Sequence, residues 1–193
     1  MQSVRCKMTT ATITFTGDPA YGGGSITRSY ELPIIQGTNG NESLTGTGNS
    51  DRILGLDGND IIAGGNGNDI LYGSNSQSGG NDYDILTGNT GVDYYGVGWS
   101  GGNYYNEPGK TYALITEYNG AGETIIINRD SGIDVISKAI SGIGDTRKDL
   151  LILDGGNRVQ AILQDRGNLE TAFDTDITDS NKGINDIGEF FFV

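Results

Sequence analysis

The sequence predicts an all-β protein built around a parallel stack of short coils. Three observations support this fold class. Residues 37–96 repeat every nine residues, branched apolar runs bounded by turn residues lie on both sides of the repeat, and no segment keeps a 3.6-residue apolar period beyond two turns. We therefore expect an N-terminal strand or hairpin in residues 1–36, the repeat in 37–96, and a β-sandwich-like capping region in 97–193.

The N-terminal part is predicted to form a β-hairpin or a cap over the first repeat. Residues 11–16 alternate polar and apolar side chains, which indicates a half-buried strand with Ile13 and Phe15 on one face. Three consecutive glycines then mark a turn. Residues 25–32 predict a second strand, and Pro33 is expected to end it.

The central repeat follows the pattern G-G-x-G-x-D-x-U-x, in which U is a large apolar residue. A six-residue interruption at 73–78 separates the fourth unit from the fifth, and we expect it to bulge from a turn. The six units are residues 37–45, 46–54, 55–63, 64–72, 79–87 and 88–96.

Each nonapeptide divides into a turn and a strand. Glycine and asparagine in the first six positions permit the positive φ angles of tight turns. The last three positions suffice only for a brief strand whose middle residue points inward. Two units make one coil, and several coils must stack, because one coil buries too little apolar surface to offset its chain entropy. The inward residues are Leu44, Ile53, Ile62, Leu71, Leu86 and Tyr95.

The sixth position of each unit places an acid on a turn. Successive units alternate between the two sides of a coil, so acids on one side are two units apart. This pairs Asp51 with Asp69, and Glu42 with Asp60, across eighteen residues. Beyond the interruption, the spacing becomes twenty-four residues. It then pairs Asp60 with Asp84 and Asp69 with Asp93.

These acid pairs indicate a metal site on each side of the roll. A hard ion with six to eight oxygen ligands can bridge two carboxylates and the carbonyls of the glycine turns. Oxygen ligands alone favour Ca²⁺ over zinc or copper, and Mg²⁺ prefers a smaller, stricter octahedron. We expect roughly three to four Ca²⁺ ions. The candidate ligands are Glu42, Asp51, Asp60, Asp69, Asp84 and Asp93, with the glycines Gly46, Gly48, Gly55, Gly64, Gly65, Gly67, Gly79 and Gly80.

The composition excludes several functions. Twenty-five acids oppose twelve bases, and this net charge of −13 argues against nucleic acids and anionic membranes as partners. The chain has no histidine, which removes the usual general base and zinc ligand, and its single cysteine, Cys6, cannot form an intrachain disulfide. No stretch approaches the roughly 20 apolar residues of a membrane span. The N-terminus also lacks the apolar region of a Sec signal peptide.

The C-terminal part is rich in strand signals. Asn-Gly and Asp-Gly turn sequences separate runs of branched residues. The predicted strands are residues 112–116, 124–127, 134–136, 150–153 and 159–163.

The nonapeptide resembles the RTX, or haemolysin-type calcium-binding, family, and the chain is similar to its cyanobacterial secreted members. The similarity extends through residues 88–119 and the strand pair at 151–163. It implies a parallel β-roll, export by type I secretion, and an extracellular or cell-surface location, where Ca²⁺ modules work at ~10⁻⁴–10⁻³ M. The last five residues, 189–193, are similar to the family's terminal secretion signal; the alternative is simply a last strand.

Three functions compete. The first is a secreted calcium-binding structural protein, a surface-layer, matrix or filament subunit that forms a homo-oligomer or polymer. The motivation is that only 36 residues precede the repeat, which leaves no place for the effector domain of the family. The second is an adhesin that binds a surface polysaccharide by stacking sugars on Tyr94, Trp99, Tyr104 and Tyr105. A calcium-dependent enzyme is disfavoured, because most of the acids that catalysis would need are expected to bind Ca²⁺ instead.

Overall fold

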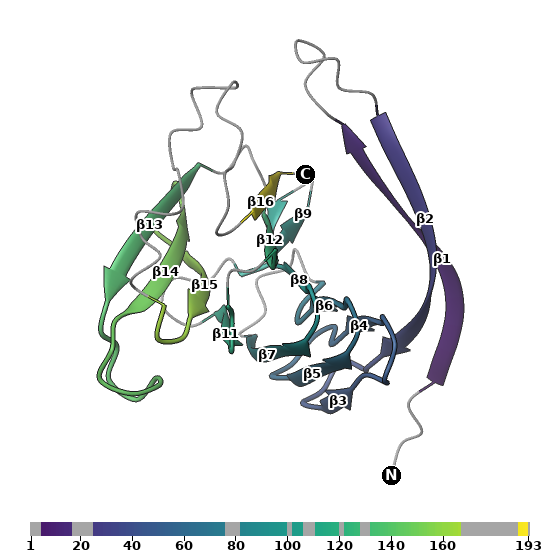
Figure 1. The fold of residues 1–193 in the computed structure, drawn as a ribbon. Helices are drawn as coiled ribbons and strands as arrows, with labels where there is room; N and C mark the ends of the chain where they lie inside the picture. The colour runs from purple at the N-terminus through teal and green to yellow at the C-terminus, as the bar shows by residue number, and fades with distance from the viewer. Residues whose placement is uncertain are drawn as a thin grey trace.

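The computed structural model is all-β, as predicted (Figure 1). It describes residues 5–16, 25–75, 82–99, 102–105, 111–119, 122–127, 132–166 and 189–192. Within these ranges there is no helix, and hence none that could span a membrane.

Two seven-stranded sheets form the molecule, and a short ribbon of β9 (Gly98–Trp99) and β10 (Gly102–Asn103) accompanies them. The first sheet, called sheet A, has the order β1 (Arg5–Thr16), β2 (Ser25–Gln36), β4 (Arg52–Leu54), β6 (Ile70–Tyr72), β8 (Tyr94–Gly96), β12 (Thr124–Ile127) and β16 (Glu189–Phe192). The second, called sheet B, has the order β13 (Ile133–Lys138), β14 (Asp149–Asp154), β15 (Val159–Leu163), β11 (Tyr112–Thr116), β7 (Tyr83–Thr90), β5 (Ile61–Asn66) and β3 (Ser43–Thr45).

The repeat forms the predicted parallel roll, because successive units alternate between the two sheets. In sheet B, Leu44 pairs with Ile62, and Ile62 pairs with Leu86. In sheet A, Ile53 pairs with Leu71 in the same way. The turn between β6 and β7 takes up the interruption, so the strands on either side keep their register. Residues 76–81 of this turn lie outside the described part of the chain.

A continuous apolar ladder fills the space between the sheets. The middle residue of every repeat strand is buried, and all six inward residues predicted from the sequence belong to one cluster. Their side chains are branched or aromatic, so they pack well on a pleated surface. This ladder is the core of the roll.

The roll continues past residue 96, where the sequence predicted a new part. Strand β11 pairs in parallel with β7, and β12 pairs in parallel with β8. Ile115 and Ile125 are buried in the same cluster and extend the ladder by one coil. The predicted boundary therefore does not coincide with a break in either sheet, because a coil needs an inward apolar residue but not the glycine pattern. Beyond it, β13, β14 and β15 complete sheet B as an antiparallel edge.

The N-terminal strands form an antiparallel hairpin of two twelve-residue strands. Contrary to the prediction, β2 does not end at Pro33 but continues to Gln36. Pairing of β2 with β4 begins only at Ile34, so the missing N–H of Pro33 precedes that ladder. The side chains of Ile13 and Phe15 lie outside the described part of the structure.

The C-terminal strands agree with the sequence analysis in number and position. Strands β11, β12 and β15 match the predicted runs, while β13 and β14 are longer by a few residues at their ends. The last predicted strand is present as β16, which pairs in parallel with β12 at the edge of sheet A.

We predict that the inward ladder dominates the stability of the roll. Leu71→Ala, between Ile53 and Tyr95, should cost about 2–5 kcal/mol, because it removes a fully buried side chain. Leu54→Ala is the matched control, since this neighbouring side chain is only half-buried, and it should cost at most about 1.5 kcal/mol. Denaturant unfolding in Ca²⁺ measures both. Equal costs would contradict the ladder as the core.

Candidate metal centres

The acids of the repeat stand in two columns, one on each side of the roll. The first column contains Asp51, Asp69 and Asp93. The N–H of Asp51 donates to Asp69 Oδ1 at 2.8 Å, and the N–H of Asp69 donates to Asp93 Oδ1 at 2.9 Å. The carboxylates of Asp69 and Asp93 therefore contact the coil before their own, and the acids pair across eighteen and then twenty-four residues as predicted.

The second column contains Glu42, Asp60 and Asp84 and repeats this arrangement. The N–H of Glu42 donates to Asp60 Oδ1 at 2.8 Å, and the N–H of Asp60 donates to Asp84 Oδ1 at 2.9 Å. Glu42 differs from the aspartates because it is only half-buried, and the N–H and hydroxyl of Thr38 already donate to its carboxylate. It is the most solvated member of the two columns.

Four carboxylate oxygens in the columns are buried without a hydrogen-bond partner. They are Oδ1 of Asp51 and Oδ2 of Asp60, Asp69 and Asp93. A buried charged oxygen without a partner is costly, and proteins usually satisfy it with a donor or a metal ion. The unused oxygens are therefore the first observation that fits a bound cation.

The glycine at the first position of a unit makes room for converging oxygens. A Cβ placed on Gly55 would lie 2.2 Å from Asp60 Oδ2 and 2.4 Å from the carbonyl oxygen of Gly73 on the next coil. At Gly64 the distance to Asp69 Oδ2 would be 2.3 Å. Carboxylate and carbonyl oxygens of neighbouring coils thus approach one another where only glycine fits. This donor set suits a hard ion such as Ca²⁺.

Three more predicted glycines have structural reasons to be glycine. A Cβ on Gly46 would lie 1.9 Å from the carbonyl oxygen of Gly64 and 3.0 Å from Asp51 Oδ2. Gly65 and Gly67 have φ angles of 111° and 119°, in the region that disfavours side chains. These positions shape the turns that carry the carboxylates.

The remaining predicted glycines do not line a site in the described structure. A Cβ on Gly48 would meet no atom within 4 Å, so nothing approaches it closely. Gly79 and Gly80 lie outside the described residues. Gly73, which the sequence analysis assigned to the interruption, takes the first-glycine place of the unit of Asp84: its Cβ would lie 2.3 Å from Asp84 Oδ2. The interruption therefore begins after Gly73. The nine-residue step from Gly64 to Gly73 is the feature of the sequence that could have predicted this.

Side chains alone do not complete a site. In the described ranges, no three carboxylate, thiol or imidazole groups gather into a cluster that could hold a metal ion. Each ion would need the two carboxylates of neighbouring coils together with carbonyl oxygens of the turns.

Burial raises the pKa of four column aspartates, Asp60, Asp69, Asp84 and Asp93. Desolvation raises the pKa of Asp69 to about 7, against the N–H bond from Asp51, and the charges of Asp93 and Asp51 add to the effect. Desolvation also raises the pKa of Asp84 to about 7 and that of Asp60 to about 6. These four carboxyl groups therefore hold protons more tightly than ordinary carboxylates do.

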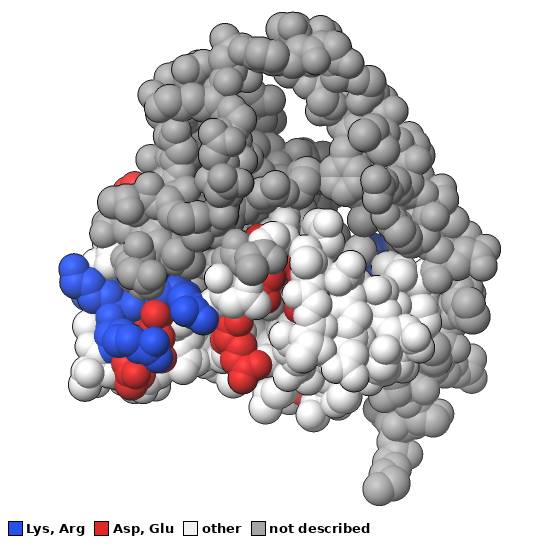
Figure 2. All heavy atoms as spheres, viewed as in Figure 1, with Lys and Arg blue, Asp and Glu red and all other residues white. Residues whose placement is uncertain are grey.

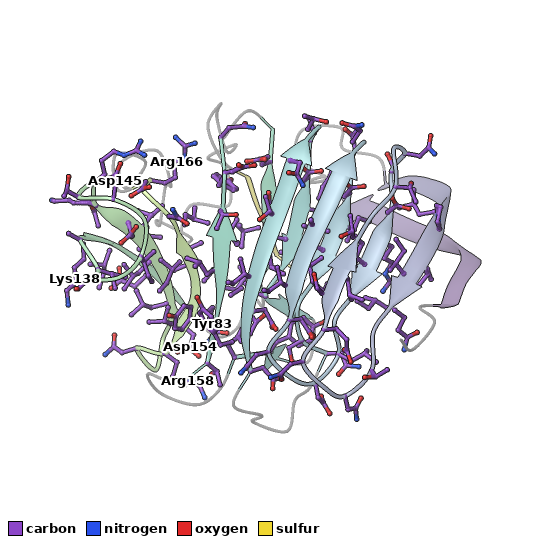
Figure 3. All side chains as sticks on the ribbon, turned by 90° about the horizontal axis from the view of Figure 1, so that it is seen from below. Tyr83, Lys138, Asp145, Asp154, Arg158 and Arg166 are labelled. Atoms are coloured by element: carbon purple, nitrogen blue, oxygen red, sulfur yellow. The ribbon has the colours of Figure 1, made fainter. Side chains whose placement is uncertain are left out.

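Among the described residues, no ion pair joins a base to a column acid. Ion pairs among the described residues join Arg147 to Asp145 and Asp165, and Arg158 to Asp154 at 2.6 Å. Figure 2 shows basic side chains gathered at the end of the molecule that carries the β13–β14 connection, and Figure 3 shows Arg158 beside Asp154 at that same C-terminal end. The described ion pairs thus leave every column acid without a cationic side chain.

The aromatic loop that the sequence suggested as a sugar platform packs against the roll. Tyr105 is 1% exposed, and its hydroxyl donates to Asp84 Oδ2 at 2.7 Å. Tyr104 is half-buried and meets the ring of Tyr72 edge-on, with centroids 6.2 Å apart. Tyr94 is also half-buried, and the side chain of Trp99 lies outside the described part. Burial removes Tyr105 from any exposed stacking surface.

A comparison with protein families agrees with the geometry of the turns. The RTX calcium-binding nonapeptide repeat family matches residues 36–71 with four copies, so this segment consists of RTX calcium-binding repeats. Among solved structures, the chain is similar to the AlgE6R3 subunit from the Azotobacter vinelandii mannuronan C5-epimerase, at 20% identity and a TM-score of 0.48, covering 78% of this chain and 86% of that one. No curated protein matches the chain.

We predict opposite pH dependence with and without metal. The folded pKa values of about 6 to 7 exceed the ordinary value of 3.8, so the metal-free fold binds more protons than the unfolded chain and should lose stability as pH rises through this range. In saturating Ca²⁺, protons compete with the ion, so stability should instead rise with pH. Thermal unfolding of metal-stripped and Ca²⁺-loaded protein between about pH 5 and pH 8 checks both signs. The same sign in both series would contradict the assignment.

We predict that Asp69 is the most sensitive acid, because it lies between two column neighbours. Asp69→Ala should raise the Ca²⁺ concentration needed for folding at least ~10-fold, since both adjacent sites lose a ligand. Asp57→Ala removes a charge from a half-buried turn position outside the columns and serves as the control. Circular dichroism during Ca²⁺ titration gives the midpoints. Equal shifts in the two variants would show that only net charge matters.

Proposed function

We propose that this chain is a secreted calcium-binding structural protein that folds on Ca²⁺ outside the cell and assembles with copies of itself. A surface-layer, extracellular-matrix or filament subunit fits this description. The observation that carries the assembly is the N-terminal hairpin, whose strand β2 pairs with β4 of the roll through Ile34–Gln36. No enzymatic activity is part of the proposal.

The calcium sites follow from the two columns. Each column has two pairs of neighbouring acids, so we propose four ions, one for each pair. Three observations support this: the repeat match over residues 36–71, the buried carboxylate oxygens that accept no hydrogen bond, and the close approach of oxygens at the first glycine of a unit. Because an ion that binds only the folded state adds its binding free energy to stability, Ca²⁺ would drive folding of the roll.

This linkage supports folding after export. Buried, unneutralised carboxylates disfavour the fold where free Ca²⁺ is scarce, and extracellular modules work at ~10⁻⁴–10⁻³ M. An unfolded chain in the cell suits type I secretion, and we propose the last five residues as its signal. The strand formed by Glu189–Phe192 is compatible with this role, because it would pair with β12 only after export.

The hairpin leaves long strand edges for a partner. Strands β1 and β2 pair over twelve residues each, but β2 contacts β4 only through Ile34–Gln36. In Figure 1 the hairpin extends along and beyond the roll. An isolated two-stranded hairpin is marginally stable in water, and an open strand edge is a template for pairing. Within the described strands, β1 is the outer edge of sheet A. We propose that a second copy pairs there.

The aromatic loop supports assembly over adhesion as the first function to test. The adhesin hypothesis depended on exposed aromatic rings, but Tyr105 is buried and holds Asp84, while Tyr104 packs on Tyr72. These rings serve the roll itself.

We predict that proline in the edge strand weakens self-association. Neighbouring residues of an antiparallel strand point their N–H groups alternately toward and away from the partner strand. Thr12→Pro and Ile13→Pro, made separately, therefore remove one inward and one outward donor, and both clash with strand extension. We expect the concentration for association in Ca²⁺ to rise at least ~10-fold in each.

Light scattering and sedimentation in Ca²⁺ measure this association, with Thr12→Ala as the matched control. The calcium-dependent circular dichroism of the roll should be unchanged in all three variants. A wild-type chain that remains monomeric at high concentration in Ca²⁺ would reject the assembly.

A further inference from the structure

The first column continues beyond the recognisable repeat to a buried glutamate. Thr124 pairs with Tyr94, and the N–H of Thr124 donates to the carbonyl of Asp93 at 2.9 Å. The N–H of Tyr94 donates in the same way to the carbonyl of Asp69 at 2.8 Å. The backbone of Glu123 therefore lies one coil above that of Asp93, as the backbone of Asp93 lies above that of Asp69. Glu123 is 0% exposed.

The local structure around Glu123 also repeats that of a unit. The N–H of Asn119 donates to Glu123 Oε2 at 2.6 Å. At the other end of the column, the N–H of Thr47 donates to Asp51 Oδ2 at 2.6 Å, again from four residues before the acid. Ile125, two positions after Glu123, is buried in the core ladder like the apolar residue of each repeat. Residues 118–119 and 122–126 thus follow the arrangement of a further unit, although their sequence lacks most of the glycine pattern.

The two columns end differently. In the second column, the hydroxyl of Tyr105 donates to Asp84 Oδ2, so a neutral donor satisfies the last carboxylate. In the first column, Asp93 Oδ2 is buried and accepts no hydrogen bond. The coil above Asp93 supplies a second buried carboxylate, Glu123, where the coil above Asp84 supplies Ala113.

The oxygens of this coil step converge. A Cβ placed on Gly88 would lie 2.1 Å from Asp93 Oδ2 and 2.6 Å from Tyr95 Oη. Tyr95 Oη in turn lies 3.5 Å from Glu123 Oε1, a weak contact for a buried carboxylate. The phenolic oxygen of Tyr95 thus lies near an oxygen of each acid, Asp93 Oδ2 at Gly88 and Glu123 Oε1.

We propose that Asp93 and Glu123 hold a further Ca²⁺, so that the first column binds one ion more than its aspartates indicate. The oxygen-only set selects a hard divalent cation, and carbonyl groups of the turns would complete the coordination. This inference rests on the proposal that the columns bind Ca²⁺, but it does not depend on self-assembly.

The test is the number of Ca²⁺ ions bound per chain in Glu123→Gln. Flow dialysis with Ca²⁺ and calorimetric titration of the full chain should show the loss of one ion, while the other sites remain. Glu117→Gln removes the same charge from an exposed side chain nearby and should keep the wild-type number. An unchanged ion number in Glu123→Gln would overturn the inference. A wild-type chain that binds no Ca²⁺ would instead reject the proposed function.

A second variant decides the case in which Glu123→Gln does not fold. Glu123→Asp keeps the carboxylate but shortens its arm, so the affinity of one ion should change at least ~5-fold while the others stay constant. Unchanged affinity of every ion would show that Glu123 only holds Asn119. Tb³⁺ emission excited through tyrosine gives an independent readout, because Tyr95 lies at the site. We expect Glu123→Gln to reduce this emission, and equal emission would count against the site.

Discussion

Repulsion between buried carboxylates is the constraint on which the rest of the roll depends. Four column aspartates, Asp60, Asp69, Asp84 and Asp93, each use one oxygen to accept an N–H from the previous coil, and this bond fixes how the coils stack. The same bond brings the carboxylates of neighbouring coils close together in a place without solvent. The stacking that positions the turns therefore also creates the electrostatic cost that an ion must offset.

The apolar ladder and the columns are complementary, because they lie in different parts of each coil. The ladder runs between the sheets and needs only one inward residue per strand, so it continues through β11 and β12 without the repeat. The columns lie on the turns and depend on glycines that let oxygens approach. Burial of the ladder stabilises the fold under all conditions, whereas the columns stabilise it only when a cation is bound. Cation binding therefore controls whether the roll folds.

The period of nine residues was sufficient to predict the parallel stacking, the inward ladder and the acid pairs. Counted back from Asp84 it missed Gly73, which lies nine residues after Gly64, and it could not reveal Glu123. Gly73 precedes a lengthened turn, so counting back from Asp84 leads to Gly79, although the oxygen of Asp84 lies against Gly73. Glu123 lies in a turn whose glycines are displaced, and only strand pairing places it above Asp93. Tyr105 was assigned to an exposed loop because sequence does not show that a hydroxyl can satisfy a carboxylate at the end of a column.

The turns tolerate large changes in length while the strands keep their register. Residues that pair in sheet B are separated by 18, then 24, then 29 positions, and the ladder between the sheets is uninterrupted. Chain length at the rim thus changes without a change in the register of the core strands. The rim can accept foreign peptides without a redesign of the interior, so the roll is a platform for displaying sequences at regular intervals along its axis.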